Sequence, residues 1–197
     1  MRRSVCIPGV ILGFLLATAS AYADGYVAPS IGVNFGGDAG RTLIGNVDDS
    51  SKISYGVAAG YMGKGIFGVE EDFSYSPNFY GKGGNIVATR VFTLMTNVIL
   101  GIPIGGQTGG GIRPYVSGGL GLINRNVETG LSLPSFSSNQ VAYDVGAGLM
   151  GYFSDHFGMR GDVRYFRNLE STDNNTLGVS LGHFSFARAS VGVLFRF

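Results

Sequence analysis

Apolar and polar residues alternate with a period of two along much of the chain, most clearly at its end. From Ala187 to Phe197, one parity holds only Ala, Val and Phe. The other parity is Arg188, Ser190, Gly192, Leu194 and Arg196. Because successive side chains of a strand point to opposite faces, this segment has one apolar face and one mostly polar face. Such a strand fits an outer face in lipid and an inner face on a polar lumen.

Eight segments carry this strand pattern, and none has a convincing helical period. They are residues 26–36, 54–61, 67–75, 86–101, 113–124, 141–153, 157–166 and the segment that ends at Phe197. Several reach the length of about 9–11 residues that a tilted strand needs to cross a bilayer. No apolar run after Ala23 is long enough for a transmembrane helix, so a membrane-spanning chain must close its sheet. The prediction is an all-β, eight-stranded antiparallel up-and-down transmembrane β-barrel.

The first residues have the pattern of a secretory signal peptide. Arg2 and Arg3 precede an apolar stretch at 5–19, and Ala21 and Ala23 form an A-x-A cleavage site. Cleavage is expected after Ala23. The predicted organisation is therefore a signal peptide at 1–23 and one barrel domain at 24–197.

Composition narrows the class further. The 34 glycines, 14 phenylalanines and 10 tyrosines favour strands and turns over helices. Without the two arginines of the signal, 12 basic residues face 13 acidic ones, which gives no basic excess for nucleic acid. Cys6, the sole cysteine, lies in the signal. The mature chain therefore offers no disulfide, thiolate nucleophile or cysteine metal site.

The connections between the segments alternate in length. Bacterial outer-membrane barrels have short periplasmic turns and longer extracellular loops, and this pattern places both termini in the periplasm. The connection at 102–112 is Gly-rich and long for a turn. The gaps are long at 37–53, 125–140 and 167–183, intermediate at 76–85, and short at 62–66 and 154–156.

Several short motifs lie within the predicted strands: Gly68-Val69-Glu70, Arg113-Pro114-Tyr115-Val116-Ser117-Gly118-Gly119-Leu120-Gly121, Val145-Gly146-Ala147-Gly148, Gly161-Asp162-Val163-Arg164-Tyr165 and the terminal Phe197. They resemble those of the small eight-stranded outer-membrane barrels of Gram-negative bacteria, the OmpA/OmpX-like and opacity-protein-like family. The resemblance implies an outer-membrane location, in contact with lipid and lipopolysaccharide. It also implies that the last strand, with Phe195 and Phe197, is the signal for the barrel-assembly machinery.

Charged residues gather on the inward parity. An eight-stranded barrel is narrow enough for side chains to fill it, and buried charges must be paired. The favoured interpretation is a charge-paired polar core; the alternative is a narrow conduction path or gate made of the same pairs. The inward charges are Glu70, Asp72, Asp144, Arg160, Asp162, Arg164, Arg188 and Arg196.

Glu71 breaks the parity rule, because it falls on the lipid-facing side of its strand. A carboxylate in the middle of the membrane is costly. The pattern leaves two explanations: a bulge in this strand, or a position near the membrane interface.

Candidate chemistry is sparse, and no cofactor, metal or catalytic residue is predicted. Gly146–Gly151 match G-x-G-x-x-G but lack the strand–turn–helix context of a dinucleotide site. His183 and Ser185 share the outward parity, as a base and nucleophile facing lipid would, but no acidic residue follows them. His156 reads as a solvated turn residue.

The leading hypothesis is a non-enzymatic structural or surface-interaction protein with an adhesion-like role. Its binding surface for an extracellular ligand or host surface would be the first, third and fourth loops, at 37–53, 125–140 and 167–183. The fourth loop carries Glu170, Asp173, Asn174 and Asn175. The alternatives are a narrow, porin-like passive channel and, more remotely, a lipid-modifying enzyme. A soluble lipocalin-type barrel fits poorly, because its water-exposed parity would be rich in Gly and Ala. Aromatic residues also concentrate near strand ends, as interface girdles do.

Overall fold

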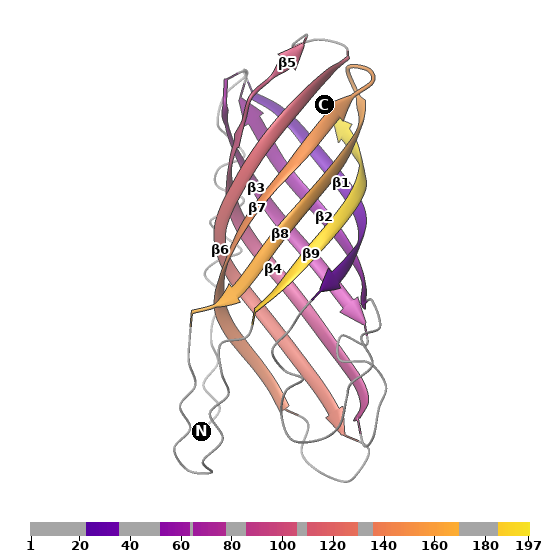
Figure 1. Ribbon diagram of the computed structural model, residues 1–197, viewed down its shortest axis with the longest axis vertical. Coiled ribbons are helices and arrows are strands. Elements are labelled where there is room, and N and C mark those ends of the chain that lie inside the picture. Colours follow the sequence, from indigo (N-terminus) through magenta and orange to yellow (C-terminus); the bar gives the residue numbers. More distant parts are fainter. Residues whose placement is uncertain are drawn as a thin grey trace.

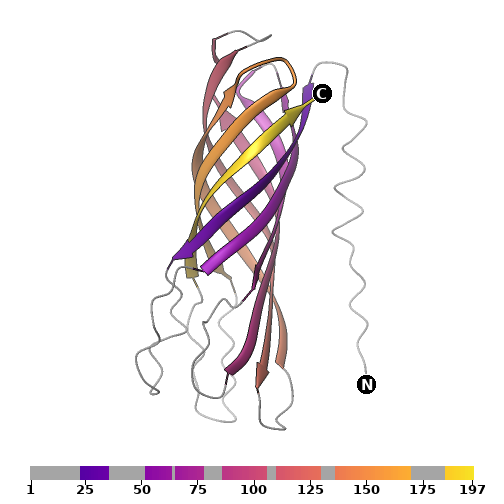
Figure 2. The ribbon, with the colours of Figure 1, turned by 90° about the vertical axis from the view of Figure 1, so that its right-hand side faces the viewer.

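The fold is built from β-strands alone in the part of the chain that the structure describes. A computed structural model describes residues 23–35, 52–63, 65–77, 86–105, 110–129, 136–169 and 185–197 (Figures 1 and 2). Over these ranges, no helix is long and apolar enough to cross a membrane. The strands are β1 (Ala23–Phe35), β2 (Lys52–Gly63), β3 (Phe67–Pro77), β4 (Ile86–Gly101), β5 (Ile104–Gly105), β6 (Gly111–Thr129), β7 (Phe136–Tyr152), β8 (Phe157–Asn168) and β9 (Ser185–Arg196).

Eight of these strands close into an antiparallel barrel, which confirms the predicted fold class. Each strand pairs with its neighbour in sequence, β1 pairs with β9, and β4 pairs with β6 across the two-residue β5. Followed once around the barrel, the register that starts at Arg196 returns to β9 at Phe186, ten residues away. This stagger tilts the strands against the barrel axis, as Figure 1 shows, and it brings residues of distant strands to one level.

The wall has its apolar side outward. Along β8, Val163 is 58% exposed whereas Arg164 is fully buried. The same alternation holds in β3 and over most of β9. Since the outer wall is apolar and the charged side chains point inward, the lipocalin-type alternative is excluded, and the outer wall suits lipid.

The predicted strand limits were wrong at the third loop. Backbone pairing of β6 with β7 continues to Val127 and Phe136, so the connection shrinks from 125–140 to 130–135. With β4, these two strands extend past the rest of the barrel at its lower end in Figure 1. Alternation is no guide there, because backbone pairing does not require a contrast between the two faces of a strand.

The opposite end of the barrel carries the short turns and both ends of the described chain. Residues 153–156 connect β7 to β8, and Gly25 exchanges backbone hydrogen bonds with Phe197 at 3.1 and 2.9 Å. The connection at 102–112, which is long for a turn, contains β5. This short strand pairs with the start of β6. Gly105 in it has φ of 101°, a left-handed conformation that favours glycine. We call this the turn end and the opposite one the loop end.

Candidate functional site: the barrel lumen

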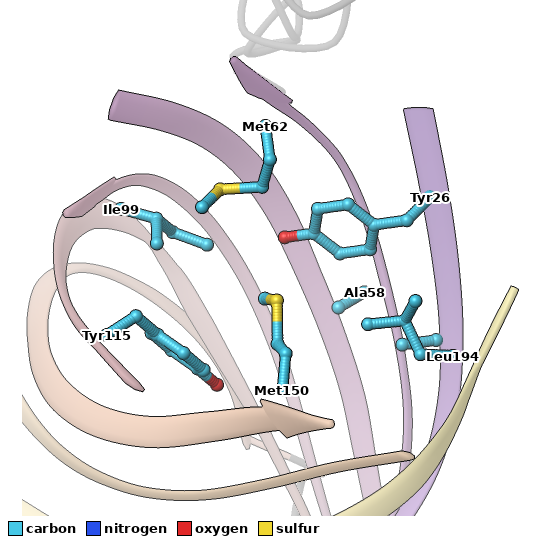
Figure 3. Close-up of a cluster of buried hydrophobic side chains, with 8 residues drawn as sticks. Tyr26, Ala58, Met62, Ile99, Tyr115, Met150 and Leu194 are labelled. Atoms are coloured by element: carbon cyan, nitrogen blue, oxygen red, sulfur yellow. The ribbon is translucent and has the colours of Figure 1, made fainter. Parts of the chain in front are cut away.

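An apolar cluster fills the lumen at the turn end (Figure 3). Its members come from six strands, β1, β2, β4, β6, β7 and β9, which bring them together at one level of the barrel. All are at most 5% exposed, so their side chains pack against one another across the barrel. The cluster is Tyr26, Ala28, Ala58, Met62, Ile99, Tyr115, Met150 and Leu194.

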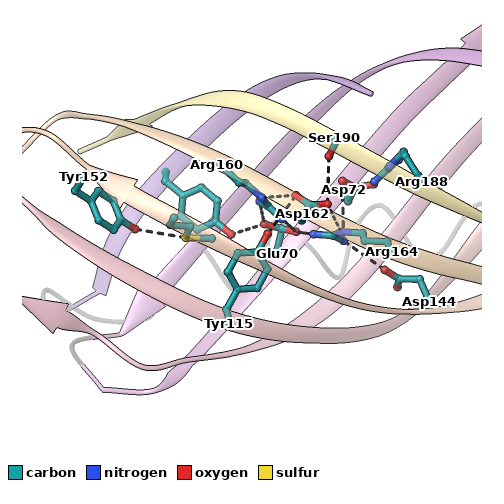
Figure 4. A network of polar contacts seen from close by, with 12 residues as sticks. Glu70, Asp72, Tyr115, Asp144, Tyr152, Arg160, Asp162, Arg164, Arg188 and Ser190 are labelled. Carbon is teal, nitrogen blue, oxygen red and sulfur yellow. Dashed lines mark hydrogen bonds and ion pairs between the residues drawn. The ribbon is translucent and has the colours of Figure 1, made fainter. Parts of the chain in front are cut away.

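A layer of charged side chains follows toward the loop end (Figure 4). Two carboxylates lie on β3 and three charged residues at every second position of β8, because a period of two keeps them on the inner face. The layer comprises Glu70, Asp72, Asp144, Arg160, Asp162, Arg164 and Arg188, none more than 8% exposed.

Three residues donate hydrogen bonds to Glu70. The guanidiniums of Arg160 and Arg164 both donate to its carboxylate, and Arg160 does so with two nitrogens. The hydroxyl of Tyr26 donates to the same oxygen as one of the Arg160 contacts. Glu70 therefore links the apolar cluster to the charged layer.

Asp162 is the second hub of the layer. Nε of Arg160 donates to it at 2.9 Å and Nε of Arg164 at 3.2 Å. The hydroxyls of Tyr115 and Ser190 also donate to it, each at 3.2 Å. Charge-assisted bonds of this kind are the stronger class of hydrogen bond, so the hub fixes β8 against β6 and β9.

Asp72 and Asp144 have fewer partners. Arg188 donates to Asp72 at 2.6 Å, and Arg164 lies 4.0 Å from it. The ion pair of Asp144 is with Arg164, at 3.3 Å. Its Oδ1 has no hydrogen-bond partner among the described residues.

The layer thus sets four carboxylates against three guanidiniums. Buried charges are tolerated only when paired, and each carboxylate here contacts at least one arginine. This arrangement is a cross-braced ionic core: it joins β3 to β8 and β9 through the centre of the barrel.

Arg196 does not belong to this layer, contrary to the sequence-based expectation. It lies at the turn end, where its Nε donates to the carbonyl oxygen of Asp155 at 2.7 Å and its guanidinium covers the ring of Tyr152 at 4.7 Å. Parity predicts the face of a residue but not its level in the barrel. The sequence-based prediction did not include three hydrogen-bond donors to the charged layer: Tyr26, Tyr115 and Ser190. Their inward parity was the signal that could have identified them.

Beyond the charged layer, toward the loop end, the lumen holds both apolar and polar side chains. The apolar cluster is Val91, Met95, Ile123, Ala142, Phe166 and Phe186, with the last two rings stacked at 4.7 Å. Among the polar side chains, Asn34 donates to Ser76 at 2.8 Å, and the hydroxyls of Ser74 and Thr93 are 2.7 Å apart. Asn168 donates to Gln140 at 3.3 Å. Among the described residues, apolar, charged and other polar side chains therefore occupy the lumen from the turn-end cluster through the charged layer to this second cluster.

Glu71 lies on the outer wall with no bulge in β3. The pairing of β3 with both neighbours is continuous, and it sets Glu71 between Ala59 and Thr96. The Thr96 hydroxyl donates to its carboxylate at 2.9 Å. Of the two explanations left open by the sequence, the bulge is wrong. Glu71 lies midway between Phe67 and Tyr75, the outward aromatic residues near the two ends of β3.

The structure places the remaining candidates only in part. Gly146–Gly151 lie inside β7, and a Cβ at Gly146 would lie 2.7 Å from Cγ of Arg164. Ser185 begins β9, whereas His183 lies outside the described residues. His156 is exposed in the turn. No group of three or more His, Cys, Asp or Glu within the described ranges is placed to hold a metal ion.

The ends of the chain fit the barrel wall. Phe195 and Phe197 are exposed on its outside, and Phe195 meets Phe157 edge to face at 5.4 Å. Of the predicted cleavage residues, Ala21 lies outside the described residues, and Ala23 is the first residue of β1.

A closed eight-stranded barrel with an apolar outer wall and an ionic interior defines an outer-membrane β-barrel. The chain belongs to the outer membrane protein beta-barrel domain family, whose model matches residues 9–186. No curated protein sequence matches it significantly.

Solved structures of low sequence identity share the fold. The outer membrane protein OprG from Pseudomonas aeruginosa superposes with a TM-score of 0.61 at 15% identity, over 89% of this chain and 96% of that one. Neisserial surface protein A gives 0.58 at 13% identity, over 89% and 97%. Ail, the attachment invasion locus protein of Yersinia pestis, in complex with the heparin analogue sucrose octasulfate, gives 0.59 at 13% identity, over 89% and 99%.

Proposed function

We propose that this outer-membrane barrel acts through its loop end, as a structural and surface-interaction protein with an adhesion-like role. The observation that carries the proposal is the filled lumen. Each side chain of the apolar cluster at the turn end, and of the charged layer next to it, is at most 8% exposed. A barrel filled in this way serves as a rigid mount, and its variable surface is the set of connections at the loop end.

The rest of the proposal concerns the orientation, export and assembly of the chain, and it follows from the outer-membrane barrel family. An outer-membrane barrel with short turns at one end has those turns in the periplasm, so both termini lie there and the long connections face outward. Export requires the signal peptide at 1–23. Assembly uses the last strand, with Phe195 and Phe197 read by the barrel-assembly machinery. The outer wall then lies in lipid beside lipopolysaccharide.

The adhesion-like role has support from the kind of protein that shares the fold. Ail is by its name an attachment and invasion protein, and it has been crystallised with a heparin analogue. In this chain, the connections at 36–51 and 170–184 carry Asp, Glu, Asn, Ser and Gly. Such a surface is suited to hydrogen-bonded recognition rather than to binding a polyanion.

The channel alternative would require the central ionic contacts to open. Arg164 is fully buried and contacts Glu70, Asp144 and Asp162, so a path through it must break several charge-assisted bonds at once. No observation favours the enzyme alternative.

The test is to shorten the loop-end connections without altering the barrel. Residues 36–51 and 170–184 are replaced by short Gly-Asn turns, and cells that display each protein are measured for adhesion to matrix-coated surfaces and cultured epithelial cells. We expect adhesion above that of cells without the protein, lost on shortening, with heat-modifiable folding retained. The control shortens 106–109 at the turn end and should leave adhesion unchanged. Equal adhesion of folded wild-type and loop-shortened proteins would contradict the proposal.

A further inference from the structure

Glu71 is out of place on a lipid-facing wall. It lies in the middle of β3, flanked outward by Val69 and Phe73, which are 39% and 42% exposed. An ionisable side chain at this depth is costly and needs a partner. Within the barrel it has one: the hydroxyl of Thr96, a neutral donor.

The rest of the described outer wall supplies no counter-charge at that depth. The arginines on this described outer wall are Arg90 and Arg167. Arg90 lies near the loop end of β4, opposite the last residue of β3. Arg167 lies near the loop end of β8, close to the end of its pairing with β7. The remaining outward positions in the middle of the described strands are apolar or small. Lipid chains offer no hydrogen bonds, so a partner for Glu71 beyond Thr96 must come from another protein surface.

We propose that the β2–β3–β4 wall around Glu71 is the contact surface for a second copy of this chain, in a two-fold dimer within the membrane. A two-fold axis along the membrane normal sets every residue against residues at its own depth. Glu71 then meets Glu71 and Thr96 of the second copy, the groups at that depth able to complement it. If Glu71 instead contacted Arg90 or Arg167 of the second copy, one copy would be shifted along the membrane normal. Part of its apolar wall would then leave the lipid.

The chemistry of the contact is self-complementary. Two adjacent carboxyl groups hold one proton between them, so the acid O–H of one donates to the carboxylate of the other. The two Thr96 hydroxyls donate to the remaining oxygens. Ala59, opposite Glu71 on β2, is small and exposed, and small residues let two membrane surfaces approach closely.

Cysteine cross-linking in the membrane tests this surface. Ala59→Cys is introduced on a Cys6→Ser background, because Cys6 is the sole cysteine of the sequence. The matched control is Val163→Cys, outward in the middle of β8, four strands from β3 in either direction around the barrel (Figure 1). After mild oxidation of outer membranes, we expect a disulfide-linked dimer at Ala59→Cys, several-fold more abundant than at Val163→Cys.

A second set of variants ties the dimer to the carboxyl group. Glu71→Leu should reduce the Ala59→Cys dimer several-fold, while Glu71→Gln, which keeps hydrogen-bonding groups, should retain most of it. Heat-modifiable migration verifies folding, and Thr96→Val provides a milder loss should Glu71→Leu not assemble. Equal cross-linking at the two cysteine positions, an adduct of another mass, or a dimer insensitive to Glu71→Leu and Thr96→Val would overturn the proposal.

Discussion

Arg164→Met tests whether the ionic layer holds the barrel together. The guanidinium pairs with Glu70, Asp144 and Asp162 and is fully buried. Without it, Glu70 and Asp162 keep Arg160, but Asp144 loses the arginine with which it pairs. Removing one partner of a buried ionic network typically costs about 3–5 kcal/mol, because the charges that remain are uncompensated.

The matched variant is Asp144→Asn. It removes the least-contacted carboxylate and leaves three carboxylates facing three guanidiniums. Since Asp144 already has one oxygen without a hydrogen-bond partner among the described residues, we expect a cost below about 1 kcal/mol. The double variant should recover about 2 kcal/mol or more of the Arg164→Met loss, because the charge that Arg164 had paired is then absent.

Urea unfolding in lipid vesicles measures these differences. The chain has no tryptophan, so the folded fraction is followed by circular dichroism and by heat-modifiable gel migration. With an m-value of about 2 kcal/mol/M, Arg164→Met should lower the urea midpoint by roughly 1.5–2.5 M. A shift below about 0.5 M, or a double variant no more stable than Arg164→Met, would refute the view that these contacts brace the barrel.

Three further tests probe the wall and the lumen. Val145→Arg and Val193→Arg should each impair membrane assembly, at about 2–4 kcal/mol for a cation at mid-membrane, whereas Gly37→Arg in the first loop should not; normal assembly of both strand variants, measured by heat-modifiable yield, would sink the assignment of their faces. Gly121→Ala should cost about 1–3 kcal/mol in urea unfolding, because a Cβ there would lie 2.0 Å from the carbonyl oxygen of Leu94; Gly151→Ala, with nothing within 4 Å, is the control, and equal midpoints would contradict the reasoning. Asn97→Leu should leave the urea midpoint unchanged or raise it, since neither amide atom has a hydrogen-bond partner in the described protein; a clear fall would count against this.

The sequence predicted the wall of the barrel well because lipid imposes a contrast between the two faces of a strand. Val163 and Arg164 illustrate it: adjacent residues, one outward and one fully buried. The contrast vanishes beyond the membrane, and there the reading of 125–140 as a loop was wrong.

The candidate site was predictable as a set of inward charges but not as a set of contacts. Whether Arg164 reaches Glu70 depends on the ten-residue stagger of the barrel, which no local pattern encodes. The same stagger removes Arg196 from the layer, despite its inward parity, and brings Tyr26 to Glu70. The sequence shows that Glu71 breaks the parity rule, but it does not show whether the strand has a bulge there. The continuous register of β3 shows that it has none and that the carboxylate points outward.

Planar-bilayer conductance of the refolded protein tests the sealed lumen most directly, beside Asp162→Ala and Arg164→Ala. The account predicts no steady conductance from the folded, heat-modifiable wild-type protein, because the apolar cluster and the ionic layer fill the barrel. Steady wild-type channels whose conductance changes with these substitutions would contradict it and would establish the lumen charges as a gate.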